Sequence, residues 1–180
     1  MTESTSSTAA PIWNTVLRYG GITALAMIVV SLLTYLLDFN VMSITGMLLN
    51  FVVAVGVTVG ISAAAIKFQR DKIDGGYINY GRGLLVGSLT TAIGLFLSSF
   101  WNYVLINFID PGYVDNLKEK FVNTWGDSIP AEKMDEALAK FDKSGDLMTI
   151  LSNGVIAALI IGLIAGLIAA AIMKRNPPVE

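Results

Sequence analysis

Four stretches of the chain contain no charged side chain over the length of a membrane-spanning helix. They cover residues 19–37, 39–66, 83–109 and 147–173. A helix needs roughly 20 mostly apolar residues to cross the hydrocarbon core of a bilayer. A membrane barrel would instead show short segments of alternating hydrophobicity. We therefore expect an all-α fold, a four-span transmembrane helix bundle with spans at about 13–37, 43–66, 84–108 and 147–173.

The composition supports a membrane setting and excludes several kinds of chemistry. Of the 180 residues, 54% are hydrophobic and 14% are charged, whereas soluble domains have roughly a quarter charged. The sequence has no cysteine and no histidine, which excludes disulfides, thiolate nucleophiles and histidine ligands or bases. The spans also lack the carboxylate that a proton relay needs. We expect no catalytic residue, no cofactor and no metal.

The chain divides into one membrane domain and two short tails. Residues 1–12 are small and polar and indicate a flexible cytoplasmic tail. No basic residue precedes Arg18, so we interpret the first apolar stretch as a retained span rather than a signal peptide. The membrane domain is expected at 13–175, followed by a second cytoplasmic tail at 176–180.

The distribution of basic residues predicts the orientation. Lysine and arginine gather between spans two and three and after span four, at Lys67, Arg70, Lys72, Arg82, Lys174 and Arg175. Basic residues near the ends of spans stay cytoplasmic. Both termini are therefore expected inside, in a bacterial inner membrane, with the loop 110–146 outside.

The loop 110–146 has the pattern of a helical hairpin. Asp110 and Pro111 indicate an N-cap and a first helical position, and Gly126 indicates the end of the first helix. A second helix is expected to begin after Pro130 and to stop at Gly145, and Asp146 is expected to cap span four. Apolar residues recur every three or four positions in both, at Val114, Leu117, Phe121, Trp125, Ala131, Met134, Leu138 and Phe141. These stripes predict that the two helices pack on each other or on the membrane domain.

Small residues repeat at four-residue spacing in three of the spans. Span four carries Gly154, Ala158, Gly162, Gly166 and Ala170, span two carries Gly56, Gly60 and Ala64, and span one carries Gly20 and Ala24. Such faces let helices approach closely in lipid. The span-four face either packs inside this bundle, which is the interpretation we favour, or contacts a second copy or another membrane protein.

Polar residues inside the spans are uncharged. Asn50 and Asn102 are expected to form hydrogen bonds between helices. Asp38 and Asp110 lie at the span boundaries, where capping or solvation accounts for them. The glycines around Tyr77 favour a turn at the membrane interface, and the nearby basic residues either set the topology or hold anionic headgroups.

Two segments of the sequence also resemble a known family. The order of features is similar to that of a bacterial membrane family named only as domain of unknown function forty-one ninety-nine. The resemblance rests on Gly75-Gly76-Tyr77-Ile78 with Gly81 and Gly87, and on Phe100-Trp101-Asn102-Tyr103 leading into Ile109-Asp110-Pro111. It extends over about residues 13–175 and implies four spans in a bacterial inner membrane. It implies no activity, substrate or catalytic residue.

Three classes of function are left by these observations. The first is a non-enzymatic structural or accessory subunit that acts through helix–helix contacts in the bilayer. The alternative is a small oligomeric transporter or channel, with hydroxyl groups lining a polar route at Thr58, Ser62, Thr90, Thr91, Ser98 and Ser99. An enzyme is the third and weakest hypothesis. The thin positive charge excludes a nucleic-acid surface.

Overall fold

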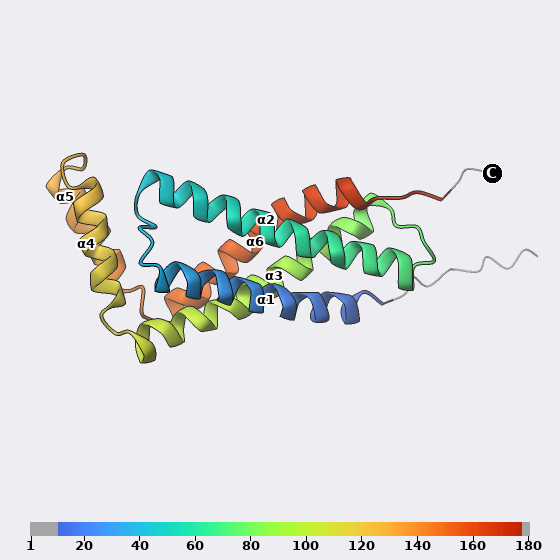
Figure 1. Cartoon of the computed structure of the whole chain (residues 1–180), viewed down its shortest axis with the longest axis horizontal. Coiled ribbons are helices and arrows are strands. Elements are labelled where there is room, and N and C mark those ends of the chain that lie inside the picture. The colour runs from blue at the N-terminus through green and yellow to red at the C-terminus, as the bar shows by residue number, and fades with distance from the viewer. Residues whose placement is uncertain (1–10, 178–180) are drawn as a thin grey trace, which may run out of the picture.

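The computed structural model describes residues 11–177, which form an all-α bundle (Figure 1). Four of its helices are long and apolar enough to cross a membrane, and the chain is a membrane protein. These four are α1 (Trp13–Leu36), α2 (Ile44–Phe68), α3 (Tyr80–Val104) and α6 (Leu147–Met173). The expected all-α class and the four spans are confirmed. The predicted tails fall mostly outside the described residues, at 1–10 and 178–180.

The two ends of the bundle differ in construction. One end carries residues 11 and 177 and the turn 69–79, and we call it the terminal end. The other carries the turn 37–43 and two further helices, α4 (Tyr113–Trp125) and α5 (Ala131–Asp142), and we call it the hairpin end (Figure 1). Both described ends of the chain thus lie on the same side of the bundle.

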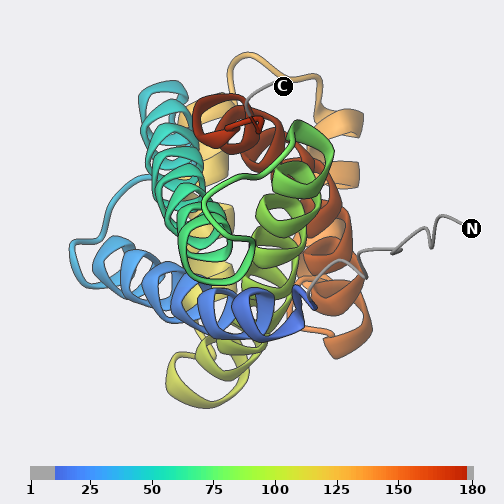
Figure 2. The same cartoon turned by 90° about the vertical axis from the view of Figure 1, so that its right-hand side faces the viewer.

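Helix α3 lies at the centre, between α1 and α6 (Figure 2). Its glycines allow both neighbours to approach closely. A Cβ atom on Gly94 would lie 2.4 Å from Cβ of Thr23 on α1, and one on Gly87 would lie 3.1 Å from Cα of Gly166 on α6. In lipid, such contacts between backbones replace hydrophobic expulsion as the force that joins helices.

Two of the spans continue past their α-helical parts as π-helical turns. Helix α2 runs into η1 (Gln69–Ile73), and α3 runs into η2 (Leu105–Ile109). The expected spans ended at residues 66 and 108, so the structure extends span two further. The sequence rule placed the end at the first charge, Lys67, but a helix can continue into the interface where charged side chains are solvated.

The hairpin lies across one end of the bundle (Figure 1). Phe121 of α4 and Phe141 of α5 stack with 5.4 Å between ring centroids, and Lys118 pairs with Asp142. The hairpin thus packs on itself, as predicted. The expected cap at Asp110 was wrong, since α4 begins two residues after Pro111 with Gly112 at its N-cap. Asp110 instead accepts a bond from the Gly112 amide, 3.1 Å away, in the preceding turn.

Asp146 caps the last span as expected. Its carboxylate accepts a hydrogen bond from the amide of Thr149 at 2.9 Å. The preceding helix, α5, ends at Asp142 rather than at Gly145. Gly145 lies in the connecting turn, where its carbonyl accepts a bond from the Asn107 side chain at 3.0 Å. The hairpin is therefore attached to the ends of both α3 and α6.

Candidate functional site

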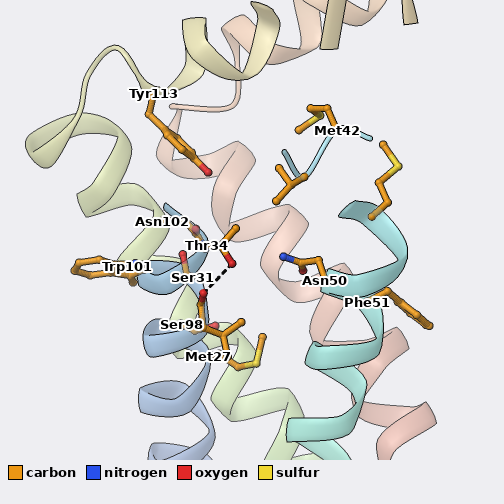
Figure 3. A pocket seen from close by; sticks show the side chains of 13 residues that line it. Met27, Ser31, Thr34, Met42, Asn50, Phe51, Ser98, Trp101, Asn102 and Tyr113 are labelled. Carbon is orange, nitrogen blue, oxygen red and sulfur yellow. Dashed lines mark hydrogen bonds between the residues drawn. The ribbon is translucent and has the colours of Figure 1, made fainter. Parts of the chain in front are cut away.

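A cavity of about 480 Å³ opens between α1, α2 and α3 at the hairpin end (Figure 3). Its polar lining comes from Ser31, Thr34, Asn50, Ser98, Asn102 and Tyr113, and its apolar lining from Met27, Val30, Val41, Met42, Met47, Phe51 and Trp101. Ligand sites in proteins typically have volumes of roughly 300–1,000 Å³ and a few polar groups on mostly apolar walls. We take this cavity as the candidate site.

The cavity exists because α2 is only loosely packed near the hairpin end. Leu48, Phe51 and Val52 are all more than half exposed there. The turn that leads into α2 fixes this geometry, since Ser43 Oγ accepts a hydrogen bond from the Gly46 amide at 3.0 Å. A Cβ on Gly46 would lie 1.9 Å from the Asn40 carbonyl oxygen, so only glycine fits at that position.

The polar groups of the cavity have unused hydrogen-bonding capacity. Within residues 11–177, the amides of Asn50 and Asn102 form no hydrogen bond through their side chains, and the buried indole nitrogen of Trp101 has no partner. Thr34 and Ser98 donate to carbonyls of their own helices, at Val30 and Leu95, both at 2.9 Å. Their oxygens can still accept. The expected bond between the helices through Asn50 or Asn102 is not formed.

Tyr113 of α4 covers the cavity from the hairpin side. Figure 3 shows its ring hanging over the space, with its hydroxyl toward Thr34 and Asn102, while Asn50 points in from α2. Burial, the nearby charge of Asp110 and the neighbouring Tyr35 all raise the pKa of the Tyr113 phenol. The phenol is therefore a neutral hydrogen-bond donor at physiological pH.

Helix α4, which carries Tyr113, is attached to the turn between α1 and α2. Lys120 of α4 pairs with Asp38 at 2.5 Å, and the Trp125 indole donates to the Met42 carbonyl at 2.9 Å. The Tyr35 hydroxyl donates to Asp110 at 3.2 Å. The two acidic residues predicted at the span boundaries thus contact partners that are 82 and 75 residues away in the sequence, which short-range sequence patterns do not indicate.

A second cavity, of about 270 Å³, adjoins the first on the α1–α2 side. Val30, Thr34 and Asn50 line both cavities. The rest of the second cavity is apolar and is formed by Leu33, Leu37, Phe39, Leu49 and Val53. Together the two cavities make one site with a polar and an apolar compartment.

The hydroxyl groups proposed to line a route are mostly closed inside the bundle. Ser62 bonds to Thr91 at 2.7 Å and to the Gly87 carbonyl at 3.1 Å, and Thr58 bonds to the Ala54 carbonyl at 2.8 Å. Thr90 is fully buried and Ser99 nearly so. Ser98 is the one member of the predicted set that lines the cavity.

The small-residue face of α6 packs inside this chain. Cβ atoms on Gly154, Gly162 and Gly166 would lie within 3.0 Å of atoms of Ser99 or Ser88 on α3. Ala158 and Ala170 are buried. The favoured interpretation of this face is therefore what the structure shows, and a partner could use these residues only by displacing α3.

The face on α2 has a different environment. Gly56 and Gly60 are exposed, and added Cβ atoms there would meet nothing within 4 Å. Ala64, one step further, is also exposed. On α1, by contrast, Gly20 contacts Ile93 of α3 and Ala24 is buried. Of the three predicted faces, α2 alone leaves its small residues uncovered among the described residues.

The model of a family described as Protein of unknown function (DUF4199) matches residues 18–175. No curated protein and no solved structure matches the chain. Within residues 11–177, no group of three or more acidic side chains is placed to hold a metal ion.

Proposed function

Because this chain belongs to the DUF4199 family, whose description names no activity, we propose its function from its own geometry: it is a non-enzymatic structural or accessory subunit of a membrane assembly. It acts through helix–helix contacts in the bilayer. The observation that carries the proposal is the uncovered small-residue face of α2, formed by Gly56, Gly60 and Ala64.

Faces of this kind favour helix association in membranes. Lipid is as apolar as the helices, so association depends on close packing of backbones along small side chains. The faces of α1 and α6 contribute this packing within the chain, where both contact α3. The corresponding residues of α2 have no such neighbour within residues 11–177, which supports a contact with a second copy or another membrane protein. We therefore assign the partner contact to α2 rather than to α6, which the sequence suggested as an alternative.

The non-enzymatic part of the proposal rests on the available chemical groups. The chain has no histidine or cysteine to act as a base, nucleophile or metal ligand. The cavity is lined by amides, hydroxyls and apolar groups, none of which titrates near neutral pH. These groups are suited to binding rather than to acid–base or covalent catalysis.

The proposed location is a bacterial cytoplasmic membrane, with both termini inside and the loop 110–146 outside. The basic residues of the terminal end support this orientation. Several also have structural roles there: Arg70 donates to the Met173 carbonyl at 3.1 Å, and Arg82 pairs with Asp74 at 2.5 Å. Arg18 lies 5.3 Å above the ring of Phe68.

A small oligomeric transporter is the second candidate, favoured by the difference between the two ends. The hairpin end contains the polar cavity, whereas the terminal end is closed by a buried hydrogen bond from Thr15 to Gln69 and a partly buried one from Gln69 to Asp74. A transporter in one of its two access states would show this asymmetry. Reconstituted liposomes that show flux of a small neutral solute would favour this candidate, and absence of flux would count against it.

Photocrosslinking in native membranes tests the subunit proposal. The natural chain has no cysteine, so a Gly56→Cys or Gly60→Cys variant can carry a single thiol-linked benzophenone. Ile160→Cys, on the exposed side of α6, is the matched control. We expect one discrete adduct of defined mass from the α2 positions and only diffuse labelling from the control. Monomer alone at all three positions would contradict the proposal.

A further inference from the structure

We propose that the two adjoining cavities bind one uncharged lipid, with its head in the polar compartment and a hydrocarbon chain in the apolar one. The ligand class is a lipid whose head carries hydroxyl or carbonyl groups and no ionic group, such as a diacylglycerol. This binding site is distinct from the α2 contact face of the proposed function and does not depend on it.

The polar compartment is suited to a head with hydroxyl and carbonyl groups. Asn50 and Asn102 each offer an amide that can donate and accept, and neither is used within the described part of the chain. Tyr113 adds a neutral donor from above. Polar groups at a site in the bilayer are stabilised by a hydrogen-bonding partner, because lipid tails cannot form hydrogen bonds with them. A ligand head with both donors and acceptors satisfies all three.

The apolar compartment is suited to a hydrocarbon chain. Its walls are side chains of α1, α2 and the turn between them, including Leu33, Leu37, Leu49 and Val53. It meets the polar compartment at Thr34 and Asn50, which line both. A molecule that fills the two compartments must therefore be polar at one end and apolar at the other. This is the chemistry of a lipid rather than of a small polar solute.

The absence of charge in the lining excludes ionic heads. Among residues 11–177, no charged side chain lines either cavity. The charged residues Asp38 and Asp110 lie outside the lining and have partners: Asp38 pairs with Lys120, and Asp110 accepts from Tyr35. A phosphate or ammonium group in the cavity would lose its hydration without gaining a countercharge, which strongly disfavours its binding. An uncharged head group loses much less hydration free energy when it enters the cavity.

The loose packing of α2 gives the ligand a path. Phe51 is about half exposed (52%) although it lines the polar cavity. Met27, Met42 and Met47 form much of the remaining apolar wall. Methionine side chains are flexible and adjust to ligands of different shape. A lipid can thus enter sideways between helices without unfolding the bundle.

The test uses the full chain in phosphatidylcholine nanodiscs with a diazirine-bearing diacylglycerol as the probe. We compare Asn50→Leu, which removes an amide from the head compartment, with Asn153→Leu, which removes an exposed amide of α6 outside both cavities. Loss of one or two hydrogen bonds should lower specific labelling roughly five- to tenfold. The control variant should label like the natural chain.

A second variant protects the test against a simple folding defect. Val53→Trp fills the apolar compartment, and Ile160→Trp places the same ring on the exposed side of α6. Both should unfold at the same temperature as the natural chain, and Val53→Trp alone should lose labelling. Labelling that is equal in all variants, or adducts that map outside the two cavities, would overturn the proposal.

Competition distinguishes the charge and the source of the ligand. Unlabelled diacylglycerol should displace the probe, and anionic phosphatidylglycerol at equal concentration should not. Displacement by long-chain diacylglycerol alone assigns the ligand to the bilayer, whereas displacement by water-soluble dihexanoylglycerol as well assigns it to free amphiphiles of the same chemistry. Equal displacement by phosphatidylglycerol would contradict the uncharged site.

Discussion

The hydroxyl of Thr15 on α1 donates a hydrogen bond of 2.5 Å to the side-chain oxygen of Gln69 in η1, and both residues are fully buried. The Gln69 amide in turn donates to Asp74 at 3.0 Å, and Asp74 accepts from Arg82 at 2.5 Å. This series of contacts joins α1, the end of α2 and the start of α3. It closes the terminal end of the bundle, in contrast to the open cavity at the hairpin end.

Replacement of Gln69 by leucine should destabilise the bundle by about 2 kcal/mol, because the buried Thr15 hydroxyl would lose its acceptor and Asp74 one of its donors. Thermal unfolding in detergent, followed by circular dichroism, measures the effect. Lys72→Leu changes an exposed side chain in the same turn and should alter stability by less than about 0.5 kcal/mol. Equal effects of the two substitutions would refute the role assigned to Gln69.

The substitutions Gly166→Ala and Gly60→Ala should have opposite effects. A Cβ on Gly166 would lie 2.1 Å from Oγ and 2.8 Å from the backbone nitrogen of Ser88, so the α3–α6 contact must open at a cost of about 1–3 kcal/mol. At Gly60 the added methyl group meets nothing, and alanine should favour the helix by up to about 1 kcal/mol. The unfolding temperatures of the two variants test this difference. A loss of stability in Gly60→Ala would show that this face of α2 packs against another part of the chain.

The spans were predictable because their signal is local. Each charge-free window corresponds to one long helix, and Asp146 was recognised as a cap from its position before the last window. The family resemblance was confirmed by the match over residues 18–175. Orientation, partners and the absence of enzymatic activity stay predictions.

The site was not predictable, because local sequence patterns do not show which helices pack together. Asn50 and Asn102 come from different helices, and no sequence spacing shows that they line one cavity. The small-residue faces of α2 and α6 look alike in sequence, yet one is exposed and the other packs on α3. Which face is covered depends on how the four helices are arranged around one another, and this arrangement is a property of the whole bundle.

Tyr113 should titrate later than an ordinary tyrosine. Burial, followed by Asp110 and Tyr35, raises the pKa of its phenol above 10.0 in the folded protein. The neutral phenol therefore contributes stability that is present below pH 10.0 and is lost as the pH rises through the folded value. The difference in phenolate absorbance between the natural chain and Tyr113→Phe reports this titration. A midpoint at or below 10.0 would contradict the burial of the Tyr113 ring over the cavity.

Loss of the contact between Lys120 and Asp38 should loosen the hairpin without unfolding the bundle. Ion pairs of exposed residues contribute at most about 1 kcal/mol, so Lys120→Met should leave the unfolding temperature nearly unchanged. Amide hydrogen exchange in α4 should nevertheless become faster, because local opening depends on these few contacts. Lys133→Met, which removes a pair with Glu136 within α5, is the control. Unchanged exchange in α4 would show that the pair between Lys120 and Asp38 does not restrain the hairpin.

A four-span bundle requires that the turn 69–79 and the hairpin lie on opposite sides of the membrane. Single cysteines at Lys72, Asn176 and Asp127, all exposed, report this through a membrane-impermeant maleimide applied to intact cells and to permeabilised cells. We predict that Asp127→Cys is labelled in intact cells, and that Lys72→Cys and Asn176→Cys are labelled only after permeabilisation. Labelling of Lys72→Cys and Asp127→Cys from the same side would contradict the four-span bundle.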